Sequence, residues 1–194
     1  ALDEGRRNFP DSTALVLAQA KALWLKGQSA DSITSLLAWD KEHPDNLEIV
    51  SFLGTAYSAQ GRDQEAASAF ENAVRLAPRD GAMLNNLAWA LRKTDPARAL
   101  SLAQQANEIK PNSAALMDTL GYLLTETGQA RKGVEMLRQA VDLAPQTPSI
   151  RYRYGAALAK AGERSLARRE LEKAIASTQA FPERDSAKEL VKGL

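Results

Sequence analysis

The chain has 194 residues, of which 44% are hydrophobic and 25% charged, a composition ordinary for a globular protein with a sizeable core. The formal net charge of +1 gives no overall field that would attract nucleic acid or an anionic membrane. There is no cysteine, which excludes disulfides, thiolate metal sites and cysteine nucleophiles. No apolar run approaches the roughly 18 residues of a membrane-spanning helix, so we expect no direct membrane insertion by this segment.

Proline recurs at one phase along the chain, at positions 10, 44, 78, 111 and 145. Four glycines lie midway between these prolines: Gly27, Gly61, Gly128 and Gly162. A fixed period near 34 residues indicates a tandem array. Each unit is typical of two helices joined at the glycine, which tolerates the left-handed backbone that ends a helix. Nothing alternates with period two over a useful length, so no strands are expected.

In chain order, residues 1–10 are interpreted as the remnant of a preceding repeat, and they show no targeting signal. The predicted repeats cover residues 13–46, 47–80, 81–113, 114–147 and 148–181. Residues 182–194 are expected to form one extra helix that caps the array, because the last repeat of a solenoid would otherwise expose a core face. The chain is thus predicted to be a single solenoid domain.

Polar residues that follow the prolines are predicted to cap the first helix of each repeat: Ser12, Asn46, Asp80, Asn112 and Thr147. The third repeat lacks the turn glycine and reads RKTDPARA instead. There Asp95 is expected to cap the second helix and Pro96 to start it.

Residues 47–80 resemble a tetratricopeptide repeat, and the matching positions are Leu53, Gly54, Tyr57, Ala66, Phe70, Ala73 and Pro78. The third unit is one residue short, and the first is the most divergent. The resemblance implies an all-α fold, a right-handed α-α superhelix of five helix-turn-helix repeats followed by the capping helix.

Two residues depart from the usual pattern inside predicted second helices. Trp39 stands where a small residue is usual, and we expect it to fill the core or the end of the array. Gly133 lies within ARKGVEML, where glycine costs up to about 1 kcal/mol relative to alanine. Gly133→Ala is therefore expected to stabilise the fold, unless a neighbouring helix packs too closely for a methyl group.

The run MLNNLAWALRK in the third repeat contains two asparagines and a tryptophan in a helix of mostly Ala and Leu. Leu84, Leu87, Ala88 and Leu91 have the spacing of an inward stripe. Asn85 and Trp89 are four residues apart and share the neighbouring stripe, with Asn86 at its edge. In the tetratricopeptide fold that stripe lines the concave face, so these residues are predicted to bind a ligand.

The same stripe offers Asp118 and Tyr122 in the fourth repeat, and Tyr152 with Arg153 beside it in the fifth. Amide groups can pair with a peptide backbone, and aromatic rings supply rigid contact area. The predicted partner is therefore a protein or an extended peptide. The alternative is that Trp89 packs against Tyr122 and that the asparagines are only solvated.

No catalytic, cofactor or metal motif is present, and we expect a protein that is not an enzyme. The single histidine, His43, is expected to lie at a helix end. Carboxylates such as Glu170 are predicted on exposed helix faces. Residues 147–194 hold ten Lys and Arg against six Asp and Glu, a modest excess that does not indicate nucleic-acid binding.

Residues 81–194 also resemble the tetratricopeptide lipoproteins encoded with bacterial exopolysaccharide and PEP-CTERM/exosortase sorting systems, through LNNLAWAL, LMDTLGYLL and the closing FPER…AKELVKGL. This implies a scaffold for polymer export or protein sorting on the periplasmic side of the outer membrane, with a cytoplasmic location as the alternative. Two other functions stay open. One is a substrate-recruiting domain of a larger enzyme such as a glycosyltransferase, and the other is an adaptor in pilus or secretion assembly.

Overall fold

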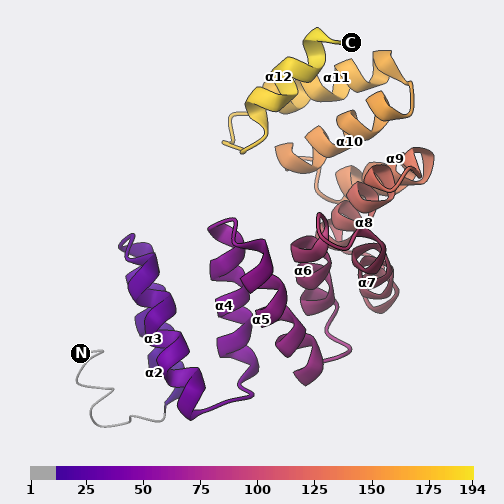
Figure 1. Cartoon of the computed structure of the whole chain (residues 1–194). Helices are drawn as coiled ribbons and strands as arrows, with labels where there is room; N and C mark the ends of the chain where they lie inside the picture. The colour runs from indigo at the N-terminus through magenta and orange to yellow at the C-terminus, as the bar shows by residue number, and fades with distance from the viewer. Residues whose placement is uncertain (1–11) are drawn as a thin grey trace. The chain divides into compact units, whose positions relative to one another are not determined.

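The computed structural model describes residues 12–194. Within this range all regular secondary structure is helical, with eleven α-helices numbered α2 to α12 and joined by short turns (Figure 1). The expected all-α architecture of consecutive helix pairs is confirmed. None of the described helices is both long and apolar enough to span a bilayer. The chain divides into two compact units, Ala1–Pro78 and Arg79–Leu194. The interpretation of residues 1–10 as a repeat remnant lies outside the described residues.

The first unit contains two helix pairs: α2 (Thr13–Leu25) with α3 (Ser29–Glu42), and α4 (Leu47–Ala59) with α5 (Asp63–Leu76). Its largest fully buried side chains are Val16, Leu36, Ile49 and Phe70. A Cβ atom on Gly54 would lie 2.6 Å from Cε1 of Phe70. Glycine therefore allows the phenylalanine ring of α5 to lie directly against the backbone of α4.

Trp39 is only 6% exposed, which confirms its predicted packing role. Its ring stacks on His43 at the end of α3, with 4.2 Å between the ring centroids. His43 thus covers one face of a core side chain, and it lies at the helix end as expected.

The second unit contains seven helices: α6 (Gly81–Leu91), α7 (Pro96–Ile109), α8 (Ala114–Glu126), α9 (Ala130–Leu143), α10 (Pro148–Lys160), α11 (Arg164–Ile175) and α12 (Arg184–Lys192). The last helix packs on α11, where Leu171, Ala174, Phe181 and Ala187 form a buried cluster. The prediction that residues 182–194 add one helix to cover the final repeat is confirmed.

Four of the predicted helix caps are confirmed by their hydrogen bonds. Asn46 and Asp80 each accept two backbone N–H bonds in the first turn, and Ser12 accepts one from Leu15. Asp95 accepts from the N–H of Arg98 at 3.1 Å, and Pro96 starts α7, as expected.

Of the other two predicted caps, Asn112 is wrong, and Thr147 is right in its position but not in its hydrogen bond. Ser113 rather than Asn112 is the N-cap residue of α8, and its side chain makes no capping bond. Thr147 has the N-cap position of α10, but its side chain also makes no capping bond. The four turn glycines have φ between 70° and 87°, so they adopt the left-handed conformation that was predicted.

The expectation that Gly133→Ala stabilises the fold is wrong. Gly133 of α9 faces Gly121 of α8, and a Cβ atom on Gly133 would lie 2.7 Å from the carbonyl oxygen of Gly121. It would also collide with Oγ1 of Thr125, which already donates to that carbonyl at 2.8 Å. The backbones of α8 and α9 cross too closely for a methyl group. This is the exception named with the prediction, and helix propensity alone could not reveal it.

Candidate functional site

The predicted ligand-binding residues lie on α6, α8 and α10, the first helices of the three helix pairs in the second unit. In α6, Leu84, Leu87 and Leu91 are buried, which confirms the predicted inward stripe. Asn85 and Trp89 are half-buried on the neighbouring stripe. The term first-helix surface is used below for the surface formed by Asn85, Trp89, Asp118, Tyr122, Tyr152 and Arg153.

Two aromatic rings meet at the centre of the first-helix surface. The centroids of Trp89 and Tyr122 are 5.3 Å apart, and the ring planes are inclined at 52°. The guanidinium groups of Arg92 and Arg153 lie over the indole, 4.7 Å and 5.0 Å from its centroid. Such cation–π contacts hold the indole in one orientation. Trp89 thus packs against Tyr122, as the alternative interpretation expected, while both rings stay half-buried and available to a ligand.

Arg153 joins three helices of the second unit through its two terminal nitrogens. One nitrogen pairs with Oδ2 of Asp118 on α8, and the other lies 3.1 Å from Oε1 of Glu183, just before α12. Glu183 also accepts from the hydroxyl of Ser149 at 2.9 Å. The side chains of Arg153 and Asp118 are 17% and 11% exposed, so water screens this pair only weakly.

Asp118, the one acid of the first-helix surface, is buried, with 7% of the residue exposed. Burial raises the pKa of Asp118 to about 6, and the nearby charge of Glu183 adds to the rise. The charge and hydrogen bond of Arg153 lower the pKa but do not offset the burial. Asp118 therefore changes charge within the physiological range, unlike an ordinary aspartate.

Two side-chain oxygens of the first-helix surface are buried without a hydrogen-bond donor: Oδ1 of Asn85 and Oδ1 of Asp118. Buried polar atoms in folded proteins are nearly always paired, so such atoms indicate a place where a ligand or water donates. Asn85 precedes Trp89 by four residues on α6, and Asp118 precedes Tyr122 by four residues on α8.

A cavity of about 520 Å³ opens beside Tyr122, between α8, α10 and α12. Its walls are mainly apolar, and they include Tyr152, Ala156, Leu190 and Leu194. Arg153 and Lys160 also line it, and Lys160 pairs with Glu126 at 2.8 Å. A cavity of this size and lining suits an apolar side chain of a ligand whose polar groups remain at the rim.

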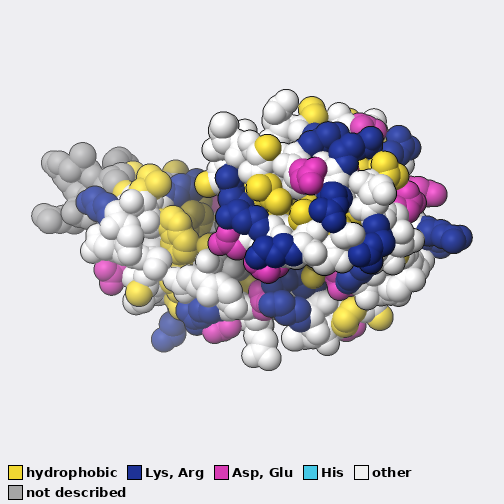
Figure 2. All heavy atoms as spheres, turned by 90° about the horizontal axis from the view of Figure 1, so that it is seen from above, with side chains coloured by type: hydrophobic (Ala, Val, Ile, Leu, Met, Phe, Trp, Pro, Cys, Tyr) yellow, Lys and Arg dark blue, Asp and Glu magenta, His cyan; other side chains and the backbone are white. Residues whose placement is uncertain are grey.

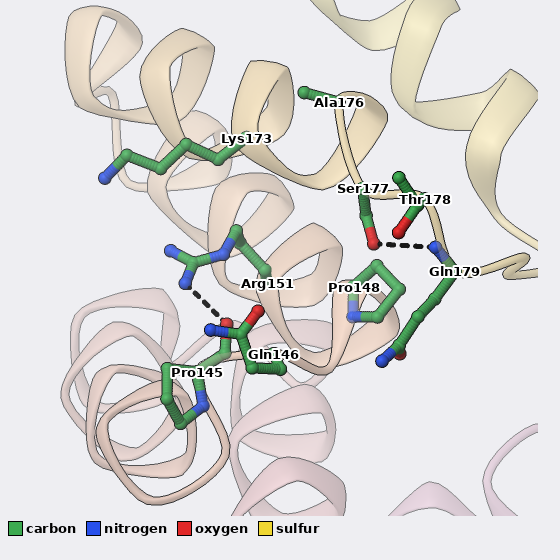
Figure 3. A pocket seen from close by; sticks show the side chains of 9 residues that line it. All are labelled: Pro145, Gln146, Pro148, Arg151, Lys173, Ala176, Ser177, Thr178 and Gln179. Atoms are coloured by element: carbon green, nitrogen blue, oxygen red, sulfur yellow. Dashed lines mark hydrogen bonds between the residues drawn. The ribbon is translucent and has the colours of Figure 1, made fainter.

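A second hollow of about 460 Å³ lies at the start of α10 and the end of α11, and its lining is more polar (Figure 3). Arg151 lines it and donates to the carbonyl of Pro145 at 2.8 Å and to Glu170 at 2.6 Å.

Glu170 is 5% exposed, so the prediction that it lies on an exposed face is wrong. Burial alone would raise the pKa of Glu170, but the hydrogen bonds and the charges of Lys173 and Arg151 together outweigh it and lower the pKa. On the face seen in Figure 2, Lys and Arg side chains are interspersed with Asp and Glu.

Three contacts link four of the seven predicted site residues: Tyr122 with Trp89, Trp89 with Arg153, and Arg153 with Asp118. Asn85 contributes its unpaired oxygen, and Tyr152 lines the cavity and packs on the cluster beneath α12. Asn86 is half-buried at the edge of the surface. Their role in binding stays a prediction.

The sequence reasoning missed Arg92 and Glu183. Arg92 is three residues after Trp89, so helical spacing alone could have found it. Glu183 lies 30 residues from Arg153 and had no local signal. Within residues 12–194, no three or more acidic or histidine side chains are grouped to hold a metal ion.

The family model for the tetratricopeptide repeat matches residues 53–114 and 119–185, which is more than half of the chain. The chain therefore belongs to the tetratricopeptide repeat family. No curated protein matches the sequence.

Several solved structures have the same fold. MamA from Desulfovibrio magneticus RS-1 is 19% identical, with a TM-score of 0.72 over 91% of this chain and 96% of its own. YrrB, described as a TPR protein with an unusual peptide-binding site, is 20% identical, with a TM-score of 0.72 over 100% and 98%. In the APC/C hetero-tetramer Cut9-Hcn1, the match is 16% identical with a TM-score of 0.81, and covers 98% of this chain and 38% of that one. These likenesses establish the fold.

Proposed function

We propose that the chain is a scaffold without enzymatic activity of its own, and that its second unit binds an extended segment of a partner protein on the first-helix surface. The observation that carries this proposal is the aromatic pair Trp89 and Tyr122. Two arginines hold it in place, and it stands beside two buried oxygens that lack donors. Rigid aromatic groups of this kind act as anchors in protein interfaces, because they lose little entropy on binding.

The comparisons support binding as the class of function. YrrB is described as having a peptide-binding site, and Cut9 is found in a complex with Hcn1. The arrangement on α6, α8 and α10 also suits a peptide, because its polar atoms can pair with backbone groups while the cavity beside Tyr122 accepts a side chain.

We further propose that this scaffold serves exopolysaccharide export or protein sorting in a bacterial envelope, on the periplasmic side of the outer membrane. The support is the resemblance of residues 81–194 to the lipoproteins of those systems. The test is fractionation of native cells, with an antibody raised against the chain. Recovery with the outer membrane is expected, and recovery in the cytosol would contradict the proposed location.

Binding is tested by selecting peptides from a random phage-displayed library on the whole chain. The affinity of a selected peptide is then measured by calorimetry for wild type and Trp89→Ala, with thermal melting in parallel. We expect Trp89→Ala to weaken binding by about 1–2 kcal/mol or more.

Tyr154→Ala is a matched control, because Tyr154 is a half-buried aromatic of α10 that packs on the core cluster of Met117 and Ile150. It should leave affinity unchanged. If Trp89→Ala and Tyr154→Ala weaken binding equally, the first-helix surface is not the binding site.

A further inference from the structure

Glu170 is surrounded by more positive charge than it can neutralise. Three cationic side chains lie within ion-pair distance of this one carboxylate: Arg151 at 2.6 Å, Lys173 at 2.9 Å and Arg169 at 3.4 Å. Three cations against one carboxylate leave a surplus of two positive charges. The pKa of Glu170 is lowered, so the carboxylate stays ionised at neutral pH and the surplus is available to an anion.

Arg151 is held in a fixed orientation. Its two terminal nitrogens donate to Glu170 at 2.6 Å and to the backbone carbonyl of Pro145 at 2.8 Å, and its side chain is 17% exposed. These bonds use two of the five N–H groups that a guanidinium carries. A cation that is already oriented loses little entropy when it pairs with an oxyanion, and a planar guanidinium matches the geometry of phosphate oxygens. Arg151 is therefore preorganised to bind an oxyanion.

Two hollows meet at Arg151 and Lys173. Both cations line the hollow of about 460 Å³ at the start of α10 and the end of α11, and both also line a hollow of about 380 Å³ whose other wall comes from α9. None of the six residues of the first-helix surface lines either hollow. An anion beside Arg151 and Lys173 thus has space around it, at a place separate from the first-helix surface.

The rest of the larger hollow is lined mainly by amides and hydroxyls. Gln146 lies beside Arg151, and Ser177, Thr178 and Gln179 form the opposite side (Figure 3). The hydroxyl oxygen of Ser177 accepts from the backbone N–H of Gln179 at 3.2 Å, so its own hydrogen can donate to a ligand. Side-chain amides and hydroxyls both donate and accept, as the hydroxyl groups of a ligand do. The larger hollow therefore suits a molecule that carries hydroxyl groups next to its anionic group.

The size and the charge of this site favour a small ligand with two negative charges. A volume of about 460 Å³ lies within the roughly 300–1,000 Å³ of small-molecule sites. Among the described residues that line the two hollows, the one further cation is Arg138, which pairs with Asp142, so the surplus charge is concentrated at one point. A phosphate monoester carries about −1.5 to −2 charges at pH 7, which matches the surplus, whereas a carboxylate carries a single charge.

We infer that the hollow at the start of α10 and the end of α11 binds a small phosphorylated molecule that carries hydroxyl groups. Its phosphate pairs with Arg151 and Lys173, and its hydroxyl groups lie against Gln146, Ser177 and Gln179. This site is additional to the first-helix surface, and it does not depend on peptide binding there.

Isothermal calorimetry at low ionic strength tests the site, because added salt screens exposed charges. The probes are inositol monophosphate, inorganic phosphate, inositol and glucuronate, which together vary the charge and the hydroxyl groups. The variants that change the site are Lys173→Gln, Arg151→Lys and Gln179→Ala. Melting followed by circular dichroism confirms that each variant is folded at the temperature of the titration.

Lys188→Gln is the matched control for Lys173→Gln. Both lysines are about half exposed, and each pairs with an acid three residues earlier on its own helix, at 2.9 Å for Lys173 and 2.8 Å for Lys188. Lys188 belongs to α12 and lines neither hollow. The control therefore removes the same charge and the same kind of ion pair without changing the site.

Wild type is expected to bind inositol monophosphate more tightly than inorganic phosphate or glucuronate, and to show no binding of inositol. Lys173→Gln should weaken the binding of inositol monophosphate by at least about threefold and Arg151→Lys by about tenfold. Lys188→Gln and Trp89→Ala should bind it like wild type. Gln179→Ala should weaken the binding of inositol monophosphate but leave that of inorganic phosphate unchanged.

Several results would overturn the inference. A dissociation constant above about 10 mM for inositol monophosphate would exclude the site. Equal weakening in Lys173→Gln and Lys188→Gln would place the phosphate elsewhere, and loss of binding in Trp89→Ala would place it on the first-helix surface. Inorganic phosphate that binds as tightly as inositol monophosphate overturns the role of the hydroxyl groups, and equally tight glucuronate overturns the preference for two charges. Peptide binding depends on Trp89 and not on Lys173, so the failure of either proposal is distinguishable from the failure of the other.

Discussion

Replacement of Gly133 by alanine tests how closely α8 and α9 pack. In an open helix the change would stabilise the fold by up to about 1 kcal/mol. Here the new methyl group would lie 2.7 Å from the Gly121 carbonyl and would collide with the Thr125 hydroxyl. Overpacking of this kind costs about 1–3 kcal/mol. Displacing Thr125 also breaks its hydrogen bond to Gly121, which costs about 1 kcal/mol more.

The expected net result is a loss of about 1–3 kcal/mol in the free energy of unfolding, measured by urea titration with circular dichroism. Gly193→Ala is the matched control, since the nearest atom that its Cβ would meet is the Leu190 carbonyl oxygen at 3.6 Å. It should change stability by no more than about 0.5 kcal/mol.

A double variant identifies the cause of the loss. Thr125→Ala removes the hydroxyl that collides with the new methyl group, so Gly133→Ala should cost less in the Thr125→Ala background than in wild type. The close Gly121 carbonyl remains, so the rescue should be partial. If Gly133→Ala stabilises the protein, the close helix crossing does not exist in solution and the reasoning is refuted.

Three further predictions concern the core, a helix cap and the buried acid. Leu87→Ala should lower the free energy of unfolding by about 2–5 kcal/mol because it leaves a cavity, whereas Trp89→Ala should cost far less. Equal losses in thermal and urea unfolding would make Trp89 a core residue. Asp95→Ala should cost about 1 kcal/mol by removing the cap of α7, and a neutral urea titration would assign the cap elsewhere. The pKa of Asp118 is about 6 in the folded protein, against about 3.9 in unfolded chains. The stability of wild type relative to Asp118→Asn should therefore be greatest below about pH 4 and fall by about 3 kcal/mol as the pH rises through about 6. A difference that does not change with pH would contradict the raised pKa.

The sequence by itself determined the features that depend on local geometry. The spacing of Pro and Gly predicted helix pairs, and the 3.6-residue period of Leu84, Leu87 and Leu91 predicted which face of α6 is buried. Asp80 and Asp95 were predicted as caps because a cap needs only a short side chain and the N–H groups two or three residues later. The same periodicity located Asn85, Trp89, Asp118 and Tyr122 on one stripe.

Only the tertiary structure decided which residues of different helices contact one another. Gly133 looked like an ordinary weak point of a helix, and only the distance between α8 and α9 shows that glycine is required there. Glu170 looked like a surface partner of Lys173, but it is buried and also pairs with Arg151, which lies 19 residues away. The pairing of Arg153 with both Asp118 and Glu183 had no local signal either. Helical spacing specifies which side of a helix a residue occupies. The distance to the neighbouring helix, which sets burial, charge pairing and the pKa of Asp118, depends on how all the side chains between the helices pack.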